Sequence, residues 1–84
     1  MQFPIINVNG TDCLTLMNGY SEAKRRAVEL LNQLGEIWPH GRDYQNHYNP
    51  KAGLQHATSE HAQRILMVRR LIVELDMLAE SVSK

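Results

Sequence analysis

Cysteine is almost absent from this 84-residue sequence, and its scarcity excludes one common way of stabilising a small fold. Cys13 is the only cysteine, so no disulfide can form within one chain. Aromatic residues are also scarce at 6%, with a single Phe and a single Trp. A chain of this length buries only about 60% of the surface that its unfolded form exposes. Such a fold usually needs a metal or a partner subunit to complete its core.

Net charge and long apolar runs are absent as well. Nine basic residues balance nine acidic ones, so no strong global field attracts nucleic acid or anionic lipid. Nucleic-acid binding through two short basic runs, Lys24-Arg25-Arg26 and Arg69-Arg70, is the weakest of the alternatives for function. No apolar stretch approaches the roughly 20 residues that a membrane helix needs. The start, Met1-Gln2-Phe3-Pro4, lacks the basic region of a secretory signal. We therefore expect a cytoplasmic protein with no membrane partner.

The hydrophobic periodicity predicts an all-α fold in a single domain over residues 1–84. Residues 1–10 form an extended arm and a turn, because Pro4–Val8 is β-branched and has no helical period. Apolar residues recur at helical spacing over 11–35 and again over 54–82. These two helices are joined by a long loop, 36–53, and are expected to fold back as an antiparallel hairpin.

The ends of the helices carry local signals. The Thr11 hydroxyl is a candidate N-cap, Asp12 follows in the first turn, and Gly35 is a candidate stop for the first helix. The sequence allows the second helix to start at any residue between Pro50 and Ser59. An Asn49 cap followed by Pro50 as the first helical residue is one of the options.

Asn18-Gly19 is the weak point of the first helix, because a glycine in a helix costs about 1 kcal/mol relative to alanine. One alternative therefore stays open, in which a β-hairpin turns at Asn9-Gly10 and the first helix begins only at Ser21.

The apolar stripes are wider than one helix pair can bury. Three residues of the second helix, Met67, Val73 and Met77, lie off its main apolar row and imply more than one packing partner. Pairing of two hairpins into a four-helix bundle is the economical way to cover these stripes, so we expect a homo-oligomer, either a dimer or a higher closed assembly.

No catalytic or metal-binding pattern is present. His40, His47, His56 and His61 show no spacing that joins two of them on one ion, and no pair of cysteines exists. Cys13 belongs to an apolar row, where a free cysteine usually serves as a small buried hydrophobe. The sequence therefore predicts a binding protein without metal or cofactor rather than an enzyme.

The loop holds the most informative stretch, Trp38-Pro39-His40-Gly41-Arg42-Asp43-Tyr44. The rings of Trp38 and Tyr44 can stack on a base, the Arg42 guanidinium suits phosphate or carboxylate, and the Asp43 carboxylate can accept hydrogen bonds from a ribose or a base. His40 and, nearby, His47 are weaker candidates. The alternative is structural, with Trp38 and Tyr44 closing the end of the bundle and Arg42 paired to Asp43.

Asn9 and Thr11 form a second candidate patch. Backbone N–H groups at the start of a helix attract anions, although an ordinary threonine cap explains the same residues. In an antiparallel hairpin this patch lies at the opposite end from the loop, so the two patches meet only across a subunit boundary.

Two of these motifs, Ile6-Asn7-Val8-Asn9-Gly10-Thr11 and Pro39-His40-Gly41-Arg42-Asp43-Tyr44, resemble those of short uncharacterised proteins of tailed phages and prophages. No reaction is assigned to that family. The resemblance implies a role in countering host defence, and some helical phage proteins of this kind form oligomers that trap nucleotide immune signals.

The sequence thus favours a small phage-encoded protein that sequesters a nucleotide-like anion. Its expected ligand contacts are Trp38, His40, Arg42, Asp43, Tyr44, Asn9 and Thr11. The alternative is an inhibitor or adaptor that binds a host protein through an exposed apolar helix face carrying Met67, Val73 and Met77.

Overall fold

The structure is a computed structural model of the whole chain, and residues 1–5 and 12–83 are described. Two long α-helices, α1 (Cys13–Glu36) and α2 (Pro50–Ser83), flank a short 3₁₀ helix, η1 (Gly41–Tyr44). The described residues contain no strand, so the predicted all-α class is confirmed. Residues 1–5 have no regular structure, while the rest of the predicted arm, with Asn9, Gly10 and Thr11, lies outside the described residues.

The N-cap of α1 is Asp12 and not the predicted Thr11, so the first helical residue is Cys13. The Asp12 backbone is extended, and its carboxylate accepts hydrogen bonds from the backbone N–H and the hydroxyl of Thr15, both at 2.9 Å. Asp12 is therefore the N-cap rather than a first-turn residue. The helix then runs unbroken through Asn18 and Gly19, so the alternative start at Ser21 is wrong. The cost of one glycine is small beside the packing of the whole helix against α2.

The other end of α1 also differs from the prediction. Gly35 is not the stop, because it keeps a negative φ and the helix continues to Glu36. The chain leaves the helix at Ile37, whose backbone N–H donates to the Leu34 carbonyl at 3.3 Å. Without a left-handed residue after the helix, the last carbonyls need other partners.

Helix α2 starts at the earliest point that the sequence allowed. The Asn49 side chain accepts a hydrogen bond from the Ala52 backbone N–H at 3.2 Å, and Pro50 is the first helical residue. Proline suits this position because its missing N–H has no partner in the first turn. The predicted range 54–82 is therefore too short, and the loop spans only 37–49, with η1 inside it.

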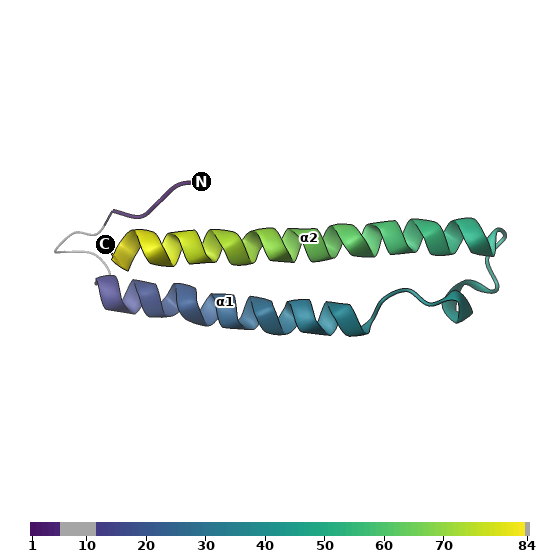
Figure 1. Cartoon of the computed structure of the whole chain (residues 1–84), viewed down its shortest axis with the longest axis horizontal. Coiled ribbons are helices and arrows are strands. Elements are labelled where there is room, and N and C mark those ends of the chain that lie inside the picture. The colour runs from purple at the N-terminus through teal and green to yellow at the C-terminus, as the bar shows by residue number, and fades with distance from the viewer. Residues whose placement is uncertain (6–11, 84) are drawn as a thin grey trace.

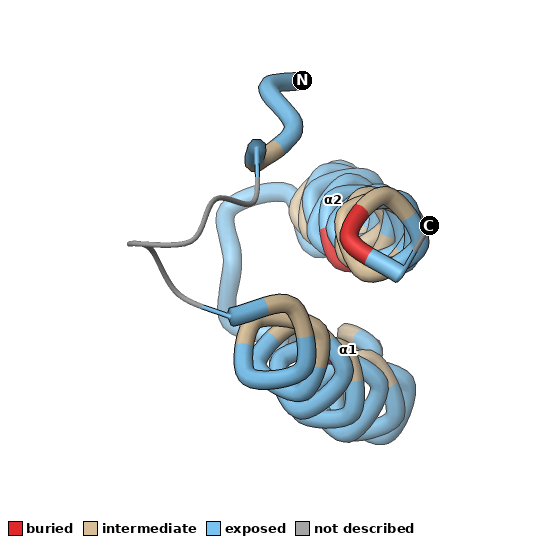
Figure 2. Tube along the Cα trace, turned by 90° about the vertical axis from the view of Figure 1, so that its left-hand side faces the viewer, coloured by how far each residue is buried: buried red, intermediate tan, exposed pale blue. Residues whose placement is uncertain are grey.

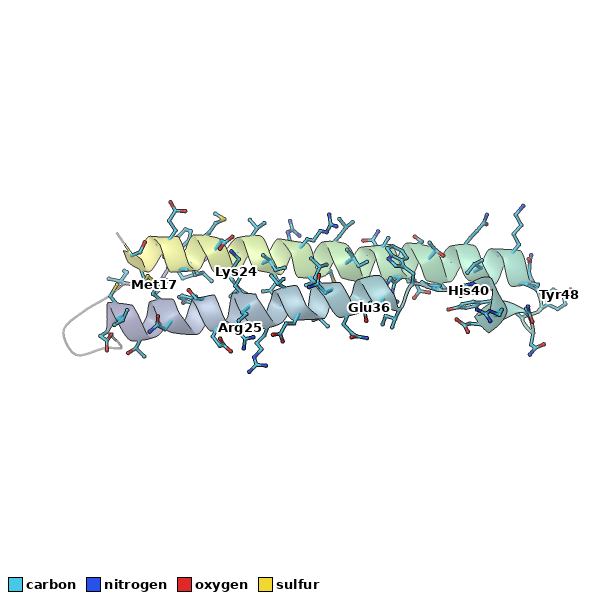
Figure 3. The ribbon with its side chains drawn as sticks, turned by 60° about the horizontal axis from the view of Figure 1, so that its bottom comes forward. Met17, Lys24, Arg25, Glu36, His40 and Tyr48 are labelled. Atoms are coloured by element: carbon cyan, nitrogen blue, oxygen red, sulfur yellow. The ribbon has the colours of Figure 1, made fainter. Side chains whose placement is uncertain are left out.

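The two long helices run antiparallel, side by side (Figure 1). The Cys13 thiol donates to the Val82 carbonyl at one end, and the Lys24 ammonium lies 2.7 Å from the Asp76 carboxylate further along. Figure 3 shows Lys24 near α2 and Arg25 projecting away from it. At the loop end α2 extends beyond α1 and contacts η1 instead (Figure 1). The result is a rod of 61 × 20 × 17 Å.

The core between the helices is thin. Among the described residues, the buried apolar side chains are Ala27, Val68 and Val82, and His61 is buried with them. No side chain in residues 1–5 and 12–83 is completely enclosed, and most of the backbone trace is exposed or half-buried (Figure 2). A single copy of the chain therefore leaves much of its apolar surface in water.

Asp12 is expected to make the start of α1 sensitive to acid. Two hydrogen bonds from Thr15 hold the pKa of Asp12 below its usual 3.8, and the bond from the Thr15 backbone N–H has the larger effect. Stability from a depressed pKa is complete above the unfolded-state value and is lost as pH falls through the folded-state value. Urea midpoints measured from about pH 6 down to about pH 2 should therefore fall more steeply for the wild type than for Asp12→Asn.

Asparagine caps helices without titrating, which makes Asp12→Asn a matched control. Glu22, whose pKa the hydrogen bond from Arg25 lowers, titrates in both proteins and cancels in the comparison. Parallel acid profiles for the two proteins would show that the Asp12 carboxylate contributes no pH-dependent stability.

Candidate binding surfaces

A buried histidine of α2, His61, forms a hydrogen bond with the C-terminal end of α1. The Nε2 atom of His61 lies 2.7 Å from the Leu34 carbonyl oxygen, and His61 is only 3% exposed. A carbonyl can only accept, so Nε2 carries the proton. The Trp38 ring meets the His61 ring edge-on, with centroids 4.7 Å apart. Trp38 is thus held by the helix pair, while 44% of it stays exposed.

The predicted motif around Arg42 folds as η1. His40 caps this turn, because its Nδ1 accepts from the Arg42 backbone N–H at 3.2 Å, and its carbonyl accepts from the Asp43 N–H at 2.9 Å. Neither the Arg42 nor the Asp43 side chain has an ion pair among the described residues, so the local Arg42–Asp43 salt bridge is not formed. Both charged groups remain exposed.

A shallow hollow lies where the loop meets the first turns of α2. The rings of Tyr44 and His47 flank it, tilted at 49° with centroids 5.0 Å apart. Its α2 side includes Gly53, His56 and Glu60, and the His56 and Glu60 side chains are 3.4 Å apart. The hollow is wide open, and Tyr48 at its rim is fully exposed at the tip of the molecule (Figure 3).

Gly53 allows the His47 ring to lie against α2. A Cβ atom at this position would stand 3.0 Å from Nδ1 of His47, which is closer than side chains normally pack. Alanine favours a helix over glycine by about 1 kcal/mol. We therefore expect Gly53→Ala to add about 1 kcal/mol to the free energy of unfolding in a His47→Ala background, and clearly less in the wild type.

A double-mutant cycle measured by urea unfolding tests this contact between Gly53 and His47. An identical effect of Gly53→Ala in both backgrounds would mean that the His47 ring does not occupy the space beside Gly53.

The structure separates the residues that the sequence grouped as one ligand site. Tyr44 and the weaker candidate His47 line the hollow, but Trp38 does not and instead packs on His61. His40 serves η1 as a cap. Asn9 and Thr11 lie outside the described residues. Tyr48, His56 and Glu60 also line the hollow, although the sequence did not point to them as binding residues. Their place follows from the start of α2 at Pro50, because residues 49, 53, 56 and 60 then share one helix face.

A second candidate surface is the outer face of α2, which we define by Leu66, Arg70, Val73 and Met77. These residues follow one another at helical spacings of four, three and four on the side opposite the buried Val68. Leu66, Val73 and Met77 are 58%, 57% and 45% exposed, and the neighbouring Met67 is 64% exposed. A hollow lies at each end of this face: Phe3, Pro4, Met77, Glu80 and Ser81 line one, and Gln63, Leu66, Met67 and Arg70 line the other.

Nothing in the described part of the chain gathers three metal-ligating side chains, and no helix there is long and apolar enough to cross a membrane. Comparison with protein-family models, with curated proteins and with solved structures yields no match.

Proposed function

We propose that the protein is a non-catalytic interaction module that binds another polypeptide chain through the outer face of α2. The observation that carries this proposal is the row of exposed apolar side chains, Leu66, Val73 and Met77, on a helix whose other side already packs against α1. Exposed apolar patches of this kind, bordered by charged residues, are typical of protein interfaces. An inhibitor or adaptor that acts on a host protein, the alternative that the sequence left open, would use such a face.

The chemistry of this face fits a protein partner better than a small solute. Met67 and Met77 have flexible, polarisable side chains, which adapt to the shape of an apolar partner surface. A helix face that presents anchors one or two turns apart suits another helix laid alongside it. The hollows at its two ends are open rather than enclosed, whereas small-molecule sites usually surround most of their ligand.

Site-specific photo-crosslinking in cells that express the protein tests this proposal. A benzoylphenylalanine side chain at position 73 is expected to give one discrete covalent protein adduct. The same group at position 25, which projects away from α2, is the matched control and is expected to give none. Equal labelling from both positions, or no adduct from position 73, would exclude the outer face of α2 as a protein-binding site.

A nucleotide-like anion at the loop end is the second candidate ligand. Arg42 supports it, because this guanidinium is exposed and has no ion pair among the described residues. The Tyr44 and His47 rings of the nearby hollow could stack on a base. With this ligand the protein would sequester a host signal in the cytoplasm, as the resemblance to phage proteins implies.

Calorimetry against cyclic dinucleotides and ADP-ribose derivatives tests this second candidate. Binding should be lost in Arg42→Ala and kept in Arg26→Ala, which removes a guanidinium that pairs with Glu22 on α1 instead. A complete absence of heat from every nucleotide in that set would remove the candidate.

A further inference from the structure

We infer that the outer face of α2 is a self-association site, on which a second copy of the chain docks antiparallel with a two-fold axis between Leu71 and Ile72. This inference rests on the proposed function, because it names the polypeptide that the face binds. Three observations support it: the spacing of the residues on the outer face of α2, the placement of their charges and the surface area of the chain.

The spacing of the outer face is the same in both directions along α2. Leu66, Arg70, Val73 and Met77 are separated by four, three and four residues. An antiparallel copy therefore brings Leu66 opposite the partner's Met77, and Arg70 opposite the partner's Val73. Each contact occurs twice, as a two-fold interface requires. Spacings of three and four residues are also those of packed helix pairs.

The hollows at the two ends of this face fit the same arrangement. The one lined by Phe3, Pro4 and Met77 lies at the level that the partner's Leu66 would reach. The other, lined by Gln63, Leu66 and Arg70, lies where the partner's Met77 would reach. Each copy thus offers one apolar side chain and one hollow at each end, and the two ends are complementary to each other.

The charges on this face distinguish antiparallel from parallel docking. Arg70 and Glu74 have no ion pair among the described residues, although other charged residues of the two helices do. Antiparallel docking places Arg70 next to the partner's Glu74, twice in the dimer. Parallel docking in register would instead set Arg70 against the partner's Arg70. Because like charges in contact oppose binding, the antiparallel arrangement is favoured.

The surface of the chain is large enough to account for a stable dimer. A single copy exposes 6582 Å². A compact monomer of 9.6 kDa would expose about 5,100 Å², so the excess is about 1,500 Å² per chain. Obligate homodimers bury about 1,000–2,500 Å² per subunit. The excess thus falls within the area that a stable dimer removes from water.

Charge exchange between Arg70 and Glu74 tests the inference. Sedimentation equilibrium should show a dimer for the wild type, and a dissociation constant raised by about tenfold or more for Arg70→Glu and for Glu74→Arg. An equimolar mixture of these two variants should form heterodimers with near wild-type affinity, because the glutamate introduced in one chain then meets the arginine introduced in the other. Lys51→Glu, an equal charge change on an exposed residue far from this face, should leave the affinity unchanged.

Disulfide trapping fixes the orientation. In a Cys13→Ser background, a Leu66→Cys chain mixed with a Met77→Cys chain should crosslink readily under oxidation, while either chain alone should crosslink poorly. Efficient crosslinking of Leu66→Cys to itself would overturn the antiparallel arrangement.

A wild type that stays monomeric at about 100 µM, well above the dissociation constants of stable dimers, would overturn self-association. The photo-crosslinking at position 73 then separates this failure from a failure of the proposed function. An adduct with a different protein would overturn the inference and keep the proposed function, whereas no adduct at all would overturn both.

Discussion

Replacing His61 with alanine is expected to lower the free energy of unfolding by about 2–4 kcal/mol, a large part of the stability of so small a domain. The ring is 3% exposed, donates to the Leu34 carbonyl at 2.7 Å and packs edge-on against Trp38. The substitution leaves a cavity and removes one of the two hydrogen bonds to that carbonyl. Urea unfolding followed by circular dichroism measures the loss.

Two further substitutions separate packing from hydrogen bonding at this position. His61→Phe keeps a ring beside Trp38 but cannot donate, so it should lose about 1–3 kcal/mol through the hydrogen bond alone. His56→Ala is the matched control, because the His56 side chain is 81% exposed and lies beside Glu60 on the surface of α2. Equal unfolding midpoints for His61→Ala and His56→Ala would show that the His61 contacts do not hold the helices together.

Trp38 gives a second, independent signal of the same contact. It is the only tryptophan, so its fluorescence reports directly on the ring packed against His61. In His61→Ala, the emission of the folded protein should shift to longer wavelength as the indole becomes wetter. The spectrum of His56→Ala should match the wild type.

Helical periodicity alone predicted the two helices, because the pattern of an amphipathic helix lies in residues close together in the sequence. Helix ends depend on single hydrogen bonds, and there the sequence offered competing caps. Asp12 is the cap because its carboxylate reaches Thr15, and Asn49 caps α2 because Pro50 fits the first helical position. Both choices became clear only with the backbone in place.

The candidate binding surfaces were less predictable than the helices. His61 stands at helical spacing before the apolar residues Ile65 and Val68, but its partner, Leu34, is 27 residues away and was not foreseeable from local spacing. The same contact places the Trp38 ring against His61 and outside the lining of the hollow at Tyr44. By contrast, the exposure of Met67, Val73 and Met77 agrees with their predicted position off the main apolar row of the second helix.

Aspartate should affect different properties at two valines on opposite faces of α2. At Val68 it should unfold the chain, and at Val73 it should prevent self-association. Val68 is 9% exposed between the helices, whereas Val73 is 57% exposed on the outer face. Val68→Asp buries a charge without a partner and should cost about 4 kcal/mol or more, enough to unfold the chain at any protein concentration. Circular dichroism and sedimentation equilibrium measured on the same samples distinguish the two outcomes.

Val73→Asp puts its charge in water in a single copy, so the helices should persist in dilute solution and only self-association should be lost. Its thermal midpoint should equal that of the wild type at low protein concentration and fall below it as concentration rises, because only the wild type gains stability from a bound copy. A Val73→Asp chain that is unfolded at every concentration would mean that Val73 belongs to the core of one subunit. The comparison of Val68→Asp with Val73→Asp therefore separates the contacts between α1 and α2 within one copy from the contacts between two copies.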